Sequence, residues 1–375
     1  MTRLLPLLSN LRLRFGLGWT SPTPVTKGQE VWLFDNTAFP TPGQPGKWSA
    51  EFVAAYFQED SGERAARVVA EIADQLGFAG DDEAESRIAE RVEPFLNMIL
   101  SRKYVDVMFG GEAGEGGVNG GEGVLKLGPA ARHGISVNEL VLPGEGYVDD
   151  QIVESSAVLV EGKATMRTAF AEEVGWGVIS DIDDTIKISE VRNRISLLRH
   201  TFVDLPTPVP GMPELYQSLQ SRLNKPVWFY LSASPYNLYP LLRSFTSTHF
   251  PRGQLLLREM SWMELQSFIV SLTIGTQRYK EERIRRAFAW LPERKWVLIG
   301  DSTQTDPEAY ATLYKEFPER VGRIWIRAVK GVDEAEEAEL NSQRRFERAF
   351  EGVPAHVWRT FEQPEELEKS VRELE

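Results

Sequence analysis

The chain reads Gly177-Val178-Ile179-Ser180-Asp181-Ile182-Asp183-Asp184-Thr185-Ile186 near its centre, a short apolar run that ends in acidic residues. A short apolar run bounded by polar residues is typical of a buried strand. In an open parallel sheet, ligands bind at the carboxyl ends of the strands. We therefore expect Asp181 and Asp183, two residues apart where this strand ends, to approach one site.

Similar apolar runs recur along the second half of the chain, separated by helical patterns: Val227–Leu231, Trp296–Ile299 and Val321–Ile326. Alternating strands and helices predict a parallel sheet that is covered on both faces. Ser232 directly follows the first of these runs, and Asp301 and Asp306 follow the second. Residues 173–375 are therefore predicted to form an α/β domain with a doubly wound parallel sheet.

These side chains match the requirements of phosphate-ester cleavage. A phosphoryl group carries negative charge, so cations must shield it from an anionic nucleophile. A carboxylate can attack phosphorus, and a second acid can protonate the leaving oxygen. Mg²⁺ binds oxygen ligands, commonly one or two carboxylates together with the substrate phosphate. The aspartates after the strands, the hydroxyl of Ser232 and the positive charge of Lys280 thus predict a magnesium-dependent phosphohydrolase.

Composition excludes several other classes of protein. The 375 residues carry a formal net charge of −13, which argues against a general nucleic-acid binder. The chain has no cysteine, so disulfides, thiolate zinc sites and cysteine nucleophiles are excluded. No stretch approaches the ~18 apolar residues that a membrane-spanning helix needs. The length favours two domains.

Residues 31–172 are predicted to form a smaller, β-rich domain that carries helices. Strand candidates lie at 31–34, 105–109, 123–127 and 155–160. Helical spacing runs from Phe52 to Leu76 and again from Ile88 to Ile99. The Gly-rich stretch 110–122 contains three glutamates, which favour a solvated loop over a phosphate-binding loop.

Residues 1–30 are predicted to form an N-terminal arm. Arg3, Arg12 and Arg14 lie among leucines there, and the first acidic residue is Glu30. This pattern is compatible with a plain arm, with a membrane-surface element, or with a targeting presequence.

Four motifs in order resemble the haloacid dehalogenase superfamily: Asp-x-Asp-x-Thr from Asp181, then Ser232, then Lys280, then Gly-Asp-x-x-x-x-Asp from Gly300. The resemblance implies that Asp181 is the nucleophile and that Asp183 is the general acid and base. It assigns phosphate binding to Ser232, Lys280 and Thr185. It assigns Mg²⁺ binding to Asp181, Asp183 (through its backbone carbonyl), Asp301 and Asp306 (directly or through water).

Several stretches are similar, more specifically, to the fungal actin-patch-associated phosphatidate phosphatases: 179–187, 230–238 and 298–302, with 31–38, 50–54 and 126–129 in the first region. One departure is Ala233, where we expect Asn in many members. The resemblance implies magnesium-dependent hydrolysis of phosphatidate at membrane surfaces to diacylglycerol and phosphate. It also implies a cytoplasmic, peripherally membrane-associated protein with protein partners in the actin patch.

Membrane contact by this acidic chain would need a local basic surface. The candidates are Lys187, Arg192, Arg194, Arg199 and His200, and a second set at Arg278, Arg283, Arg285 and Arg286. Asp184 and Asp306 have a structural alternative, because aspartate also caps helices, and Ser234 competes with Ser232 for the phosphate. Two other functions remain open: a phosphatase of another phosphomonoester, soluble or protein-bound, and a non-catalytic lipid-binding scaffold.

Overall fold

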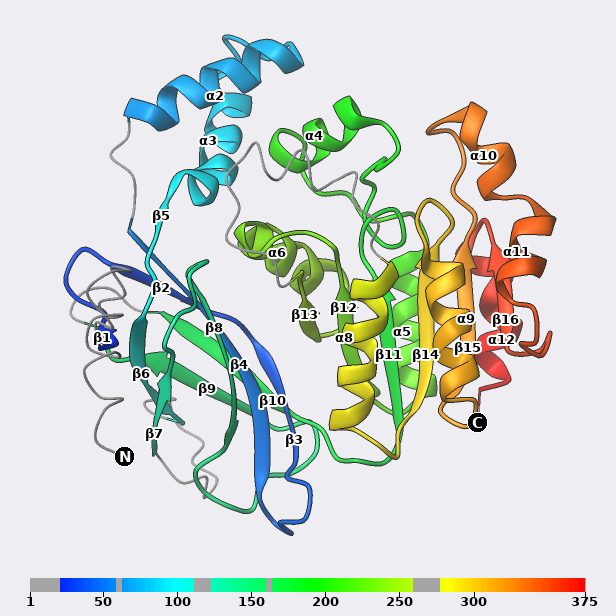
Figure 1. Cartoon of the computed structure of the whole chain (residues 1–375). Helices are drawn as coiled ribbons and strands as arrows, with labels where there is room; N and C mark the ends of the chain where they lie inside the picture. Colours follow the sequence, from blue (N-terminus) through cyan, green and yellow to red (C-terminus); the bar gives the residue numbers. More distant parts are fainter. Residues whose placement is uncertain (1–20, 59–62, 111–122, 160–163, 259–276, 375) are drawn as a thin grey trace, which may run out of the picture.

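Two β-sheets lie side by side in the computed structural model, which describes residues 21–58, 63–110, 123–159, 164–258 and 277–374 (Figure 1). Most of the predicted arm and the core of the Gly-rich stretch, 111–122, lie outside the described residues. No helix among the described ranges is both long and apolar enough to cross a membrane.

The first sheet has ten strands in the path β1-β6-β9-β10-β3-β4-β2, with β5 and β8 paired to β4 and β7 paired to β6. The strands are β1 (Thr23–Pro24), β2 (Glu30–Leu33), β3 (Asn36–Pro40), β4 (Trp48–Gln58), β5 (Met98–Ile99), β6 (Lys103–Phe109), β7 (Gly123–Leu127), β8 (Ile135–Val141), β9 (Ile152–Ala157) and β10 (Thr165–Phe170). Two helices, α2 (Glu63–Leu76) and α3 (Asp82–Leu96), connect β4 to β5. The first region is therefore rich in strands and carries helices, as predicted.

The prediction of a helical segment from Phe52 was wrong for its first part. Residues Trp48–Gln58 form strand β4, and the helix α2 begins only at Glu63. All but the last residue of β4 are buried, so neither face of the strand is exposed to solvent. A strand buried on both faces lacks the alternation that separates strands from helices in a sequence.

The second sheet has six strands, all parallel, in the order β13-β12-β11-β14-β15-β16. They are β11 (Trp176–Asp181), β12 (Val227–Leu231), β13 (Gln254–Leu256), β14 (Lys295–Asp301), β15 (Val321–Arg327) and β16 (Trp358–Phe361). Between and after them lie α4 (Arg194–Phe202), α5 (Met212–Arg222), α6 (Tyr239–His249), α8 (Gln277–Trp290), α9 (Asp306–Glu316), α10 (Glu334–Leu340), α11 (Gln343–Ala349) and α12 (Glu368–Arg372), with short 3₁₀ turns at Tyr236–Leu238 and Pro364–Leu367.

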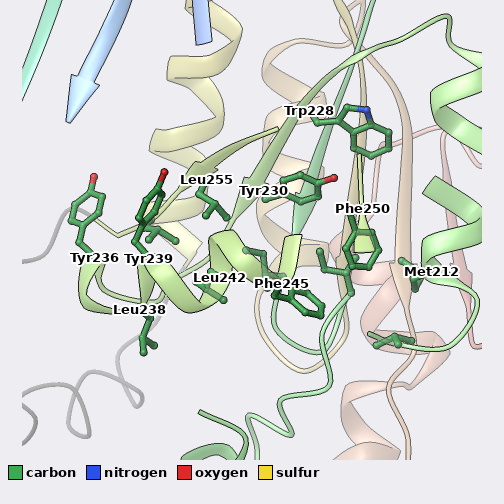
Figure 2. Close-up of a cluster of buried hydrophobic side chains, with 14 of the residues drawn as sticks. Met212, Trp228, Tyr230, Tyr236, Leu238, Tyr239, Leu242, Phe245, Phe250 and Leu255 are labelled. Atoms are coloured by element: carbon green, nitrogen blue, oxygen red, sulfur yellow. The ribbon is translucent and has the colours of Figure 1, made fainter. Parts of the chain in front are cut away.

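Helices cover both faces of the parallel sheet. Val178 of β11 packs in a cluster with residues of α5, α6 and α12, whereas its neighbour Ile179 packs with residues of α8, α9 and α11. Figure 2 shows part of the first cluster, in which Phe245 of α6 lies beside Phe250 and the rings of Trp228 and Tyr230 project from β12. The α/β prediction for this half is therefore confirmed, and both faces bury apolar side chains.

The chain from Asp333 to Arg348 forms two helices, α10 and α11. Ser342 caps the second, because its hydroxyl accepts a hydrogen bond from the backbone N–H of Arg345 at 3.3 Å. The division into domains at 31–172 and 173–375 stays a prediction, since one core cluster contains residues of both sheets.

Candidate active site

The site lies where the strand order of the parallel sheet reverses. Asp181 is the last residue of β11 and Asp301 is the last residue of β14, and these two strands are neighbours. β12 and β13 continue on one side of β11, and β15 and β16 continue beyond β14. Such a reversal leaves a crevice outside the carboxyl ends of the strands, and both predicted acids stand at it.

Asp181, Asp301 and Asp306 form one buried acidic group. Each offers a carboxylate oxygen, and these oxygens lie within 4.8 Å of one another. Asp306 is the first residue of α9, and its other oxygen accepts a hydrogen bond from the backbone N–H of Asp301 at 3.1 Å. Its carboxylate therefore ties α9 to the tip of β14 and is not the N-cap of that helix, which is Thr305.

Lys280 inserts its ammonium group into this acidic group. Its Nζ lies 2.7 Å from Oδ1 of Asp181 and also pairs with Asp306, and its side chain has no exposed surface. Lys280 belongs to the first turn of α8, which packs on the sheet. A lysine is almost never fully buried without a partner, so the burial of Lys280 depends on these carboxylates.

Two hydroxyls complete the surroundings of the acids. Thr185 donates to Oδ2 of Asp301 at 3.1 Å and lies 3.3 Å from Oδ2 of Asp181. The backbone N–H of Thr303 donates to Oδ1 of Asp301 at 2.6 Å, and its hydroxyl donates to the same oxygen. Thr185 thus bridges the tips of β11 and β14. Thr303 lies within the fourth motif at a position that the pattern leaves free, so sequence reasoning missed it.

Asp183 stands apart from the acidic group and has its own partners. Its carboxylate accepts hydrogen bonds from Ser232 at 2.9 Å and from Ser189 at 2.7 Å, and Nζ of Lys187 lies 3.3 Å away. Ser189 was not predicted, and no spacing in the sequence points to it. Ser234 contributes only its backbone N–H, which donates to Oγ of Ser232 at 3.0 Å. A phosphate at this point would compete with Asp183 for the hydroxyl of Ser232.

Asp184 has a structural role in the loop that follows. Its backbone is left-handed, with φ of 59°. Its carboxylate accepts three backbone N–H groups, from Ser189 at 3.0 Å, Glu190 at 2.7 Å and Val191 at 2.8 Å. The suggested helix-cap role does not match this arrangement, because the next helix begins only at Arg194. Asp184 fixes the loop that carries Ser189.

Burial and mutual repulsion set the ionisation of the acids. Burial raises the pKa of Asp181 well above its usual range; Lys280 opposes the rise, and Asp306 and Asp301 add to it. Burial likewise raises the pKa of Asp306 to about 6 against the effect of Lys280. Burial would also raise the pKa of Asp183, but Lys187 and the hydrogen bonds from Ser189 and Ser232 bring it below its usual value. The pKa values of the two acids of the first motif, Asp181 and Asp183, are therefore shifted in opposite directions.

The acidic group has the chemistry of a site for a hard divalent cation. All of its donors are carboxylate oxygens, the ligands that Mg²⁺ prefers over nitrogen or sulfur. Burial, and after it repulsion from neighbouring aspartates, raises the pKa of Asp181 and of Asp306, and a bound cation would offset both effects. The carboxylate of Asp183 is not part of this group.

The predicted basic surfaces are largely neutralised by ion pairs. Lys187 is buried against Asp183, so it does not belong to an outer surface. In the other candidates the pairs are Arg192–Glu336, Arg199–Asp204, Arg278–Glu282, Arg285–Glu316, Arg283–Glu51 and Arg286–Glu51. His200 lies 3.1 Å from Asp204. Of the predicted residues, Arg194 is exposed near the start of α4.

Comparison with known proteins decides which family this site belongs to. Residues 176–328, from the start of β11 to the end of β15, match the family model described as phosphatidate phosphatase APP1, catalytic domain. This segment is similar to the APP1 catalytic family. The resemblance predicted from the motifs is thereby confirmed for the APP1-like segment, which contains every predicted site residue. The family model does not reach the residues before 176, so the resemblance predicted there stays a prediction.

Two fungal proteins are similar to the chain. Phosphatidate phosphatase APP1 of Saccharomyces cerevisiae is 32% identical over 176 residues, which cover 45% of this chain and 29% of that protein. An uncharacterized protein of Schizosaccharomyces pombe is 32% identical over 160 residues, which cover 41% of this chain and 25% of that protein. The chain thus matches less than a third of the length of these relatives.

Solved structures add no argument about the APP1-like segment. A sialyltransferase from Photobacterium damsela covers 58% of this chain and 41% of its own, at 9% identity and a TM-score of 0.24. Such a score is too low to relate the two folds.

Proposed function

We propose that the chain is a magnesium-dependent phosphatidate phosphatase that works through an aspartyl-phosphate on Asp181. The observation that carries the proposal is the pairing of buried Asp181 with Lys280 beside Asp301 and Asp306. The strand order supports a doubly wound, haloacid dehalogenase-like sheet, because it is the 3-2-1-4-5-6 order of doubly wound folds with the acids at the switch point.

Asp181 and Asp183 divide the chemistry between them. The carboxylate of Asp181 attacks phosphorus, the bond to the leaving oxygen breaks, and Asp183 gives its proton to that oxygen, so that the alcohol leaves. Asp183 then takes a proton from water, the water oxygen attacks the aspartyl-phosphate, and phosphate leaves with Asp181 restored. Burial raises the pKa of Asp181, and the partners of Asp183 lower its pKa, so the two shifts by themselves run against these roles. A cation held by the acidic group would lower the pKa of Asp181 and favour the carboxylate that the attack needs.

The remaining residues bind and orient the phosphate. Lys280 pairs with the proposed nucleophile and Ser232 donates to the proposed acid, so we expect both to contact the phosphoryl oxygens. Thr185 orients Asp181 relative to Asp301. Mg²⁺, held by Asp181, Asp301, Asp306 and the backbone carbonyl of Asp183, would neutralise charge on the phosphoryl oxygens.

The lipid substrate rests on the family of the APP1-like segment and on the printed name of its yeast relative. Cytoplasmic location, peripheral attachment to membranes and partners in the actin patch stay predictions of the resemblance. Two apolar side chains near the first motif support contact with lipid: Ile195 at the start of α4 and Leu205 after its end are 69% and 71% exposed.

The test is phosphate release from phosphatidate in mixed micelles, with Mg²⁺ or with excess chelator, for the wild type, Asp181→Asn and Asp183→Asn. We expect release that needs Mg²⁺ and falls by several orders of magnitude in both variants. Cleavage of water-soluble phosphomonoesters without cleavage of phosphatidate would keep the mechanism and exclude the lipid. No cleavage under any condition would favour the lipid-binding scaffold.

A further inference from the structure

Strand β4 of the first sheet turns two different faces to its surroundings. Trp48, Ala50, Phe52, Ala54 and Tyr56 pack in the core of the first sheet. Val53, Ala55 and Phe57 pack in the cluster that includes residues of β11, β12 and α5. Side chains two apart share one face of a strand, so Glu51 belongs to the face that meets the second half of the chain.

Glu51 is a buried carboxylate on this face, and it pairs with two arginines of α8. Its side chain is 1% exposed. Nη2 of Arg283, itself 6% exposed, lies 3.5 Å from Oε1 of Glu51, and Arg286 pairs with Oε2. A second contact fixes the far end of α8, where the ring of Trp290 stacks on Phe39 of β3 with centroids 5.6 Å apart. The first sheet therefore holds α8 at two points along its length.

The same helix carries Lys280. Arg283 follows Lys280 by three residues, which is just under one helical turn, so the side chain that contacts Glu51 and the one that reaches Asp181 belong to adjacent turns. A buried ion pair contributes little net stability compared with apolar residues of the same volume. A pair with fixed geometry does, however, define the rotation and the height of a helix.

We propose that Glu51 is a positioning residue: the first sheet holds α8 through Glu51 so that Lys280 reaches Asp181 and Asp306. The matched segment begins at Trp176, so this contact joins the APP1-like segment to a part of the chain that lies before it. The role of Lys280 in this proposal rests on the proposed function. The contact between Glu51 and α8 does not depend on that function.

The test combines hydrogen exchange with kinetics on the full chain. In Glu51→Gln we expect faster amide exchange across 277–290 and a kcat about 10- to 100-fold lower, as is usual when a supporting partner of a site is lost. KM should change less, because the lipid-binding surface is retained. Glu51→Asp keeps the charge, so it should recover part of the lost kcat and part of the slow amide exchange of α8.

Asp35→Asn is the matched control. It removes another ion pair between the two parts of the chain, in which Oδ2 of Asp35 lies 2.7 Å from Nε of Arg243 on α6. This variant should lose stability while α8 keeps its exchange rate and kcat stays near that of the wild type. If Glu51→Gln does not fold, Arg286→Gln carries the same test, because the side chain of Arg286 is 35% exposed and Arg283 still pairs with Glu51.

Each outcome is decisive. Unchanged exchange in α8 of Glu51→Gln overturns the positioning contact, and faster exchange with an unchanged kcat overturns its role in the reaction. A wild type without phosphatase activity is the failure of the proposed function, and the exchange of α8 still decides whether Glu51 holds the helix.

Discussion

Nζ of Lys280 lies 2.7 Å from Oδ1 of Asp181, in a place from which solvent is excluded. The three acids of the group raise the pKa of Lys280 above its usual value, although burial alone would lower it. The ammonium group therefore remains charged where the proposed nucleophile needs a cation beside it. Two elements far apart in the sequence, β11 and α8, meet in this pair.

Lys280→Met should abolish most activity and cost stability. The substitution keeps the length of the side chain but leaves Asp181 and Asp306 facing each other without the ammonium group. We expect kcat to fall roughly 10²–10³-fold, as when one preorganised donor is removed, and the free energy of unfolding to fall by about 3 kcal/mol. Urea unfolding and phosphate release measure the two effects. Lys315→Met, at an exposed position of α9, should change neither.

Gly300→Ala should displace Asp306. A Cβ at this position would lie 2.3 Å from Oδ2 of Asp306 and 2.8 Å from its Cγ, so the carboxylate has to move. Because a shift of about 1 Å in a site costs roughly 10²-fold in rate, we expect a loss of that size in kcat. Gly322→Ala is the control, since its Cβ would meet the ring of Trp176 at 2.8 Å, outside the acidic group. Equal kcat losses in both variants would contradict the role of Gly300.

Asp184→Ala should loosen the loop that carries Ser189. The substitution removes three hydrogen bonds to a carboxylate that is 2% exposed, and it places a non-polar residue at a left-handed φ of 59°. We expect the free energy of unfolding to fall by about 3 kcal/mol, since bonds to charged groups contribute about 1.5–3 kcal/mol each and water replaces part of them. Asp184→Asn tolerates this backbone and should lose less. If chemical denaturation gave a lower free energy of unfolding for Asp184→Asn than for Asp184→Ala, this role would be contradicted.

The sequence predicted the strand tips well, because that information is local. Each apolar run of the parallel sheet ends within a few residues of its polar motif, and the structure keeps Asp181 and Asp301 at the ends of neighbouring strands. Lys280 was found through its place in a motif order. Its contact with Asp306 is a tertiary one that spacing alone does not give.

The parts that were missed depend on long-range contacts. Glu51 meets Arg283 across 232 residues, and both look like solvated charges when the sequence is read locally. Strand β4 was taken as helical because burial on both faces hides its alternation. Lys187 was predicted to contribute to a basic surface near the site, although it is buried against Asp183. In each case the surroundings of the residue are set by tertiary packing or by the geometry of a turn, and no sequence motif specifies either of them.

Mg²⁺ should stabilise the folded chain, and the stabilisation should depend on Asp301. A ligand that binds only the native state adds about 2.7 kcal/mol at 100 times its Kd, so a thermal melt with and without Mg²⁺ measures binding without any substrate. Asp301→Asn removes one of the three carboxylates of the acidic group and should reduce the Mg²⁺-dependent rise in Tm. Glu319→Gln, at an exposed position, should leave the rise intact. Sodium chloride at matched ionic strength controls for screening of the net charge of −13. An equal rise in the Asp301 variant, or an equal rise with sodium chloride, would place the effect of Mg²⁺ outside the acidic group and remove the metal from this site.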